Sequence, residues 1–244
     1  MIETFRNAWR VPELRKKLLF TFFIIIIYRV GGTVPVPYLD SAALSAWFEQ
    51  SASSGDFFSY LNVLSGGNFS KATLLALSVS PYINAQIIIQ LLTYALPPLE
   101  RLQKEGPEGR KKLNKITKYA SLAIAIFQAW AYYLTMKKAG ACVYTEGFSK
   151  IFAEIVIIAC FTAGASLTIW LGDEINEKGI GNGISMLLFA GILARFPVMA
   201  GTLGELTKNE PQRYFFESLG ILVLFIAMIA FIVFMNASER RIPI

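Results

Sequence analysis

The chain of 244 residues contains no histidine, only two cysteines and few charged side chains. Without histidine it has no Ser-His-Asp triad, no HExxH zinc site and no imidazole ligand for haem. Cys142 lies in a polar connection and Cys160 lies inside an apolar run, so the two form no disulfide framework. Charged residues make up 16% of the chain. Several common catalytic and metal sites are therefore excluded.

Long apolar runs dominate the remainder. Hydrophobic residues make up 55% of the chain, and the mean hydropathy is positive. Several runs approach or exceed ~18 residues, the length at which a transmembrane helix is predicted. The sequence therefore predicts an all-α, multi-pass membrane protein. The net charge of +6 suits anionic lipid headgroups.

Six membrane spans are predicted from these runs, at about residues 18–36, 72–96, 119–136, 151–171, 184–203 and 214–235. In the first span we expect Arg29 to extend its side chain to the membrane interface. In the second, Pro81 removes a backbone donor and should kink the helix.

The distribution of charge predicts which loops face the cytoplasm. Basic residues gather in residues 1–17 and 98–118, whereas residues 38–70 carry no Lys or Arg. The positive-inside rule then places the N-terminus in the cytoplasm, and six spans return the C-terminal end to the same side. One connection disagrees, because Lys137, Lys138 and Lys150 fall outside in this topology.

A short apolar piece, residues 57–64, precedes the second span. A helix of about eight residues covers only ~12 Å, whereas a hydrocarbon core is ~30 Å thick. It is followed at once by Ser65, Gly66, Gly67 and Asn68. A half-length helix at membrane depth must lie inside protein or line a wet cavity. We therefore predict a re-entrant segment beside a full span.

Candidate chemistry is sparse, and no metal or cofactor site is predicted. The glycines at 179, 181 and 183 fit a tight turn better than a phosphate loop, because no strand precedes them. Gly172 and Asp173 resemble half of an intramembrane aspartyl-protease motif, but no second mid-membrane Asp exists. Val79 and Ile83 are four residues apart and share a helix face. This spacing fits residues that line a pore and equally fits ordinary packing between helices.

Five stretches resemble the bacterial form of the SecY family, the channel subunits of the protein-conducting translocon. They are residues 64–72 (LSGGNFSKA), 80–93 (SPYINAQIIIQLLT), 104–112 (KEGPEGRKK), 170–185 (WLGDEINEKGIGNGIS) and 239–243 (ERRIP). They occur in the family's order and cover essentially the whole chain.

The resemblance implies roles for particular residues. A plug, about residues 56–70, would contain Phe57, Phe58, Leu61, Leu64, Ser65, Gly66 and Gly67. An aliphatic pore ring would consist of Val79, Ile83 and Leu188, of which Val79 and Leu188 depart from the isoleucine usual in the family. A lateral gate would use Asn84, Ile87, Leu91 and Gln128. Partner contacts in the cytoplasm would use Arg110, Lys111, Lys112, Arg240 and Arg241.

The resemblance also implies one half of an inverted-repeat channel, completed by the rest of a longer chain or by a second polypeptide. Residues 1–17 would be a basic segment, 18–203 a five-helix repeat, and 204–244 the sixth helix and the start of a loop. Implied partners are SecE-type and SecG-type small subunits, the SecA ATPase or a ribosome, an unfolded preprotein with its signal sequence, anionic lipids and the C-terminal half of the channel.

The implied function is passage of unfolded polypeptides across, and sideways into, the bacterial plasma membrane, without enzymatic activity. The main alternative is half of a secondary solute transporter with broken helices, and a third is an intramembrane enzyme. A transporter should place ionisable or substrate-binding side chains at the midplane, where this chain carries Val79, Ile83 and Leu188.

Overall fold

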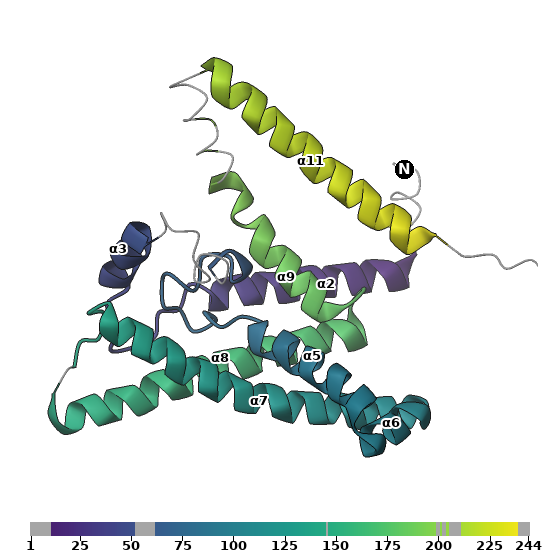
Figure 1. The fold of residues 1–244 in the computed structure, drawn as a ribbon, viewed down its shortest axis with the longest axis horizontal. Helices are drawn as coiled ribbons and strands as arrows, with labels where there is room; N and C mark the ends of the chain where they lie inside the picture. Colours follow the sequence, from purple (N-terminus) through teal and green to yellow (C-terminus); the bar gives the residue numbers. More distant parts are fainter. Residues whose placement is uncertain are drawn as a thin grey trace, which may run out of the picture. The chain divides into compact units, whose positions relative to one another are not determined.

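The computed structural model describes residues 11–51, 62–144, 146–198, 201, 204 and 211–238, and regular structure in this part of the chain is helical. Figure 1 shows the helices in chain order. They are α2 (Pro12–Gly31), α3 (Ser41–Ser51), α5 (Ser80–Ala95), α6 (Pro97–Lys104), α7 (Pro107–Lys138), α8 (Gly147–Lys178), α9 (Gly183–Leu193) and α11 (Pro211–Ala237). The prediction of an all-α fold is confirmed.

The chain divides into two compact units, Met1–Ala194 and Arg195–Ile244. The first unit contains α2 to α9. Within it, α7 and α8 pack as an antiparallel pair, α5 packs on α7, and α2 and α9 pack on α8 and on each other (Figure 1). The second unit contains α11, whose stretch Leu219–Asn236 is long and apolar enough to cross a membrane.

Proline lies in the first turn of several of these helices. Its fixed φ and missing N–H suit the first turn, where the backbone N–H groups have no helical partner. Prolines occupy that turn in α2 (Pro12), α5 (Pro81), α6 (Pro97) and α7 (Pro107). The predicted kink at Pro81 is therefore wrong, since Pro81 lies in the first turn of α5 and does not interrupt the helix.

The second predicted span differs most from the structure. Its helix, α5, begins only at Ser80, and turns and an isolated bridge occupy residues 65–79. The backbone is left-handed at Ala72 (φ +49°) and Ser78 (φ +48°), so a helix cannot pass through either residue. At 16 residues, α5 covers only about 24 Å. Apolar composition alone did not reveal this break.

The other predicted spans correspond to helices of very different lengths. Two predicted spans are too long, because residues 18–36 run past the end of α2 at Gly31 and residues 184–203 run past the end of α9 at Leu193. Residues 119–136 and 151–171 lie inside α7 and α8, each 32 residues long. By contrast α9 has 11 residues and is followed by a turn at Ala194 and Arg195. In the described part of the chain, α8 and Leu219–Asn236 meet the length and hydropathy expected of a spanning helix. The count of six spans remains a prediction.

The irregular segment 65–79 lies between two apolar clusters. One joins Phe69, Ala72 and Leu77 of this segment to α3, α7 and α8 through residues such as Leu44, Met136 and Phe161. The other joins Leu75 and Val79 to α2, α8 and α9 through Tyr28, Ile175 and Leu187. The segment is therefore held on both sides by buried side chains.

The turn between α8 and α9 confirms the turn predicted from the glycines at 179, 181 and 183. Residues 179–182 connect the two helices, and Gly181 has φ +74°. The Asn176 side chain accepts a hydrogen bond from the Gly183 N–H at 2.7 Å. Asn182 caps α9 by accepting from the Ser185 N–H at 3.2 Å. These two side-chain hydrogen bonds close the turn.

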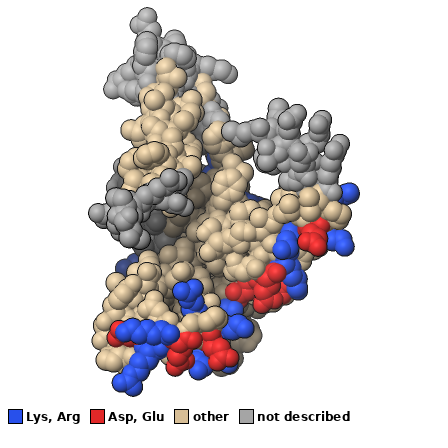
Figure 2. All heavy atoms as spheres, turned by 90° about the vertical axis from the view of Figure 1, so that its right-hand side faces the viewer, with Lys and Arg blue, Asp and Glu red and all other residues tan. Residues whose placement is uncertain are grey.

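The basic segment 98–118 is helical, not an open loop, because α6 and the first turns of α7 occupy it. Arg110, Lys111 and Lys112 are exposed there. Lys118 pairs with Asp173 of α8 at 2.6 Å. Figure 2 shows Lys and Arg gathered with Asp and Glu along the lower part of one face, while uncharged side chains cover most of the rest.

Candidate functional site

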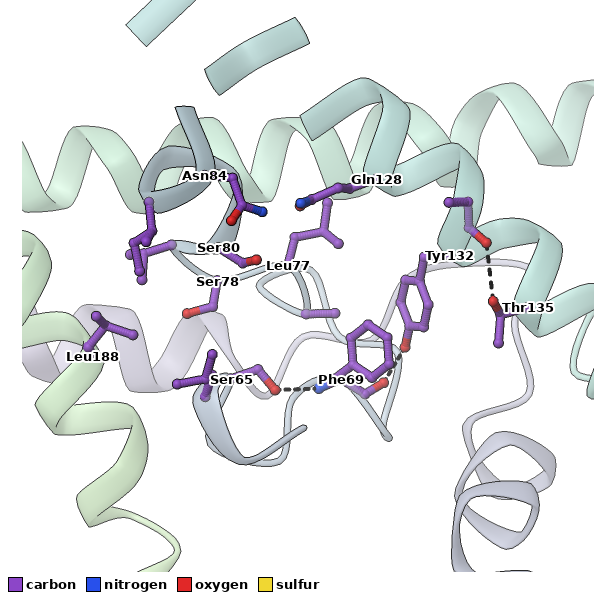
Figure 3. A pocket seen from close by; sticks show the side chains of 15 residues that line it. Ser65, Phe69, Leu77, Ser78, Ser80, Asn84, Gln128, Tyr132, Thr135 and Leu188 are labelled. Atoms are coloured by element: carbon purple, nitrogen blue, oxygen red, sulfur yellow. Dashed lines mark hydrogen bonds between the residues drawn. The ribbon is translucent and has the colours of Figure 1, made fainter. Parts of the chain in front are cut away.

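A cavity of about 290 Å³ lies in the first unit, where the irregular segment meets α5, α7 and α9. Its lining is mostly apolar, with hydroxyl and amide groups between the aliphatic and aromatic side chains. Figure 3 shows Leu188 on one side of it, and Tyr132 and Thr135 on the other. Residues more than a hundred positions apart in the sequence, such as Leu64 and Leu188, thus line the same cavity.

The three residues predicted to form the pore ring all line this cavity. Val79 comes from the end of the irregular segment, Ile83 from the first turn of α5 and Leu188 from α9. Val79 is fully buried and belongs to the apolar cluster of α2, α8 and α9, while Ile83 and Leu188 are half-buried. The structure therefore brings the predicted set together, with Val79 deepest.

The described part of the predicted plug reaches the same cavity. Leu64 and Ser65 line it, whereas Phe57, Phe58 and Leu61 lie outside the described residues. Side chains close this bend locally. The Ser65 hydroxyl accepts from the Phe69 N–H at 3.0 Å, and the Asn62 side chain accepts from the Ser70 N–H at 3.0 Å.

Gly66 and Gly67 make the bend itself. Their φ angles are +70° and +90°, in the left-handed region that residues with a Cβ rarely adopt. The Gly66 N–H donates to the Val63 carbonyl at 3.0 Å and the Gly67 N–H to the Asn62 carbonyl at 2.8 Å. These two glycines are therefore required by the turn that carries Leu64 and Ser65 to the cavity wall.

The predicted lateral gate is only partly assembled. Asn84 of α5 and Gln128 of α7 both line the cavity, and Figure 3 shows their amide groups pointing toward one another. Ile87 and Leu91 are 51% and 65% exposed and do not line the cavity. The predicted contact residues Arg110, Lys111 and Lys112 lie on α7, and Arg240 and Arg241 lie outside the described residues.

Sequence analysis missed Tyr132, which is buried against the cavity. Its hydroxyl donates to the Phe69 carbonyl, and its ring stacks on Phe69 with centroids 4.1 Å apart. A signal was present, because Gln128, Tyr132 and Thr135 are spaced four and three residues apart and share one helix face. Leu77 gave no such signal, because it lies in the irregular segment.

A second buried tyrosine, also missed, holds the far end of the irregular segment. The Tyr28 hydroxyl lies 2.9 Å from the Ser78 hydroxyl, inside the apolar cluster of α2, α8 and α9. Tyr28 and Ser78 are 0% and 3% exposed. Because buried hydroxyl groups need a partner, this contact fixes Ser78 in its left-handed conformation beside the cavity.

The chemistry of this lining suits contact with apolar groups and exclusion of water and ions. The residues that line the cavity carry no charge, and the described residues include no group of His, Cys, Asp and Glu that could hold a metal ion. Aliphatic side chains adapt to apolar groups of different shape, and a narrow apolar constriction resists filling with water and ions.

Comparison with known proteins identifies the family. A family model described as SecY matches residues 73–244. The chain belongs to the SecY family. Among SecY proteins it is 36% identical to the protein translocase subunit SecY of Streptomyces scabiei, covering 100% of this chain and 57% of that protein. It is 39% identical to SecY of Pseudomonas aeruginosa, covering 96% of this chain and 51% of that one.

Solved structures agree on the fold. The Sec61 chain of a canine ribosome-channel complex matches 94% of this SecY-family chain and 49% of its own length, at TM-score 0.62 and 20% identity. A structure concerning the plug domain of SecY matches 88% of this chain and 46% of that one, at TM-score 0.56 and 22% identity. This chain spans about half the length of the SecY relatives it matches.

Proposed function

We propose that this chain forms one half of a protein-conducting channel, which passes unfolded secretory polypeptides across the membrane and releases apolar segments sideways into it. The observation that carries the proposal is that Val79, Ile83 and Leu188 all line one cavity whose lining is uncharged. Membership of a family whose members are named protein translocase subunits supports it. The chain itself performs no covalent chemistry.

The aliphatic side chains act as the seal of the resting channel. Val79, Ile83 and Leu188 give a passing polypeptide apolar contacts that do not depend on its sequence, and they give ions no polar path. Leu64 and Ser65, carried on the glycine bend, place the end of the plug against the same cavity. The plug, residues 56–70, moves aside when a polypeptide enters.

A lateral opening between α5 and α7 releases membrane segments. Asn84 and Gln128 mark its inner edge at the cavity, and the exposed Ile87 and Leu91 extend it along α5 toward lipid. A signal sequence leaves by this opening because its transfer into lipid is favourable.

The chain crosses a bacterial plasma membrane six times, with its N-terminus in the cytoplasm. The basic side chains of α6 and the start of α7 then face the cytoplasm, where they meet anionic lipids and a SecA-type ATPase or a ribosome. SecE-type and SecG-type subunits and the second half of an inverted-repeat channel complete the assembly, with Arg240 and Arg241 in the next cytoplasmic loop.

The solute-transporter alternative is not favoured. A coupled transporter places acidic or basic side chains near the membrane midplane, whereas the residues lining this cavity include no Asp, Glu, Lys, Arg or His. Relatives of this chain at 36–39% identity are named translocase subunits. An intramembrane aspartyl protease is disfavoured as well, because Asp173 is paired with Lys118.

The test is reconstitution of the completed channel in lipid vesicles, with a SecA-type motor and a secretory preprotein. We expect the preprotein to become protected from external protease. Ile83→Asn should also raise the resting ion conductance, whereas Ile88→Asn, on the exposed surface of the same helix, should not. Absence of protection contradicts the conduit, and unchanged conductance in Ile83→Asn contradicts the seal.

A further inference from the structure

Arg29, predicted to extend its side chain to the membrane interface, contacts the end of α9. It lies in the last turn of α2, and its guanidinium turns inward to α9. It donates to the carbonyls of Ala190 and Gly191, the latter at 3.2 Å. A cation is favoured there because the last turn of a helix carries the negative end of the helix dipole. The Ala190 carbonyl also accepts from the Ala194 N–H at 3.3 Å.

The glycine bend of the plug meets α9 at the same point. A Cβ atom placed on Gly66 would lie 2.7 Å from the Gly191 carbonyl oxygen and 3.2 Å from Nη1 of Arg29. A Cβ on Gly191 would lie 3.0 Å from the Leu64 carbonyl oxygen. The backbones of the bend and of α9 are therefore in direct contact, with the Arg29 guanidinium beside both.

This junction is one helical turn from the cavity wall. On α9, Leu188 lies two residues before Ala190. On the bend, Leu64 and Ser65 are the two residues immediately before Gly66. All three of Leu188, Leu64 and Ser65 line the cavity. The end of α2 touches the segment again at Gly32, where a Cβ would lie 2.8 Å from the Asn68 side chain. A shift at the junction is thus transmitted directly to the lining.

We propose that Arg29 is a positioning residue that ties the glycine bend to the end of α9 and so holds Leu64, Ser65 and Leu188 in the closed cavity wall. The role favours a guanidinium over an ammonium, because Nη2 donates to both carbonyls of α9 while Nη1 of the same planar group lies beside Gly66. An ammonium is a compact point charge with one nitrogen. As a contribution to sealing, the role rests on the proposed function. The contact that Arg29 makes between the bend and α9 does not depend on the proposed function.

The experiment measures alkylation of a cysteine placed at Ser65, which is 2% exposed, in the completed channel with Cys142 and Cys160 replaced by serine. Arg29→Gln should speed this alkylation about tenfold, as expected for loss of hydrogen bonds from a charged donor. Arg29→Lys should give a smaller increase. Lys71→Gln, which removes an exposed positive charge from the same segment, should leave the rate unchanged.

A cysteine at Leu188 serves as a second probe if Ser65→Cys does not assemble. Equal alkylation rates at both probes in Arg29→Gln and in the parent overturn the proposal, as does full retention of the parent rate in Arg29→Lys. Resting conductance is measured on the same variants. Faster alkylation without greater leakage supports the junction and counts against the sealing function, so the two failures are distinguishable.

Discussion

Replacing Tyr28 by phenylalanine removes one buried oxygen atom and leaves the aromatic ring in place. The Ser78 hydroxyl, 3% exposed, then loses the hydrogen bond it makes with Tyr28 at 2.9 Å, the one bond described for that group. An unpaired buried hydroxyl costs about 1–3 kcal/mol. That cost corresponds to a roughly 5- to 150-fold greater equilibrium constant for opening of the segment.

The same reasoning predicts a rescue. Ser78→Ala in the Tyr28→Phe background removes the unpaired partner while keeping the Cβ at this left-handed position. Replacing both members of a buried polar pair by apolar groups is close to neutral, so the double variant should regain most of the lost protection. A cavity or ring-packing effect of Tyr28→Phe would not be reversed in this way.

Hydrogen exchange of the reconstituted channel measures the opening. The amides of Ala76 and Ser78 donate within the segment, to Thr73 and Leu75 at 2.9 and 3.0 Å, and report on it directly. Tyr119→Phe, which removes a hydroxyl from a tyrosine that is 66% exposed, is the control. The reasoning is refuted if Tyr28→Phe exchanges at the control rate, or if Ser78→Ala adds to the effect.

Three further predictions concern a buried hydrogen bond, a close approach of two backbones and a partly buried thiol. Tyr132→Phe should accelerate exchange only about 5-fold, since the Phe69 carbonyl still accepts from the Ala72 N–H at 3.2 Å; an effect larger than that of Tyr28→Phe contradicts it. Gly164→Ala should lower the melting temperature, because its Cβ would overlap the Leu74 carbonyl at a cost of about 1–3 kcal/mol, whereas Gly220→Ala, with open space around it, should not. Burial raises the pKa of the Cys142 thiol, so its maleimide labelling near neutral pH should be slower than that of a free thiol and should rise with pH; labelling independent of pH argues against it.

The long helices were predictable because their signals are local. Apolar runs flanked by charges predicted α7 and α8, and the glycines at 179–183 predicted the turn after α8. Family resemblance supplied the cavity residues Val79, Ile83 and Leu188, which composition alone could not distinguish from ordinary packing. The spacing of Gln128, Tyr132 and Thr135 carried a further signal that was not used.

The path of residues 65–79 depends on partners far away in the sequence. Tyr28 and Tyr132 bond its two ends, and Gly164 of α8 allows Leu74 to approach closely. No local pattern records these contacts, so an apolar run that could have been helical was predicted as one. The contact of Arg29 with α9 was missed for the same reason, since its carbonyl partners lie 161 and 162 residues later.

Site-specific photocrosslinking to a stalled secretory chain tests most directly whether polypeptides pass this cavity. The crosslinker is placed at Leu188, which lines the cavity, and at the neighbouring Phe189, which is 58% exposed and does not line it. We expect crosslinks to the stalled chain from position 188 and not from 189. Crosslinks from 189 alone, or from neither position while the preprotein is transported, would contradict the account.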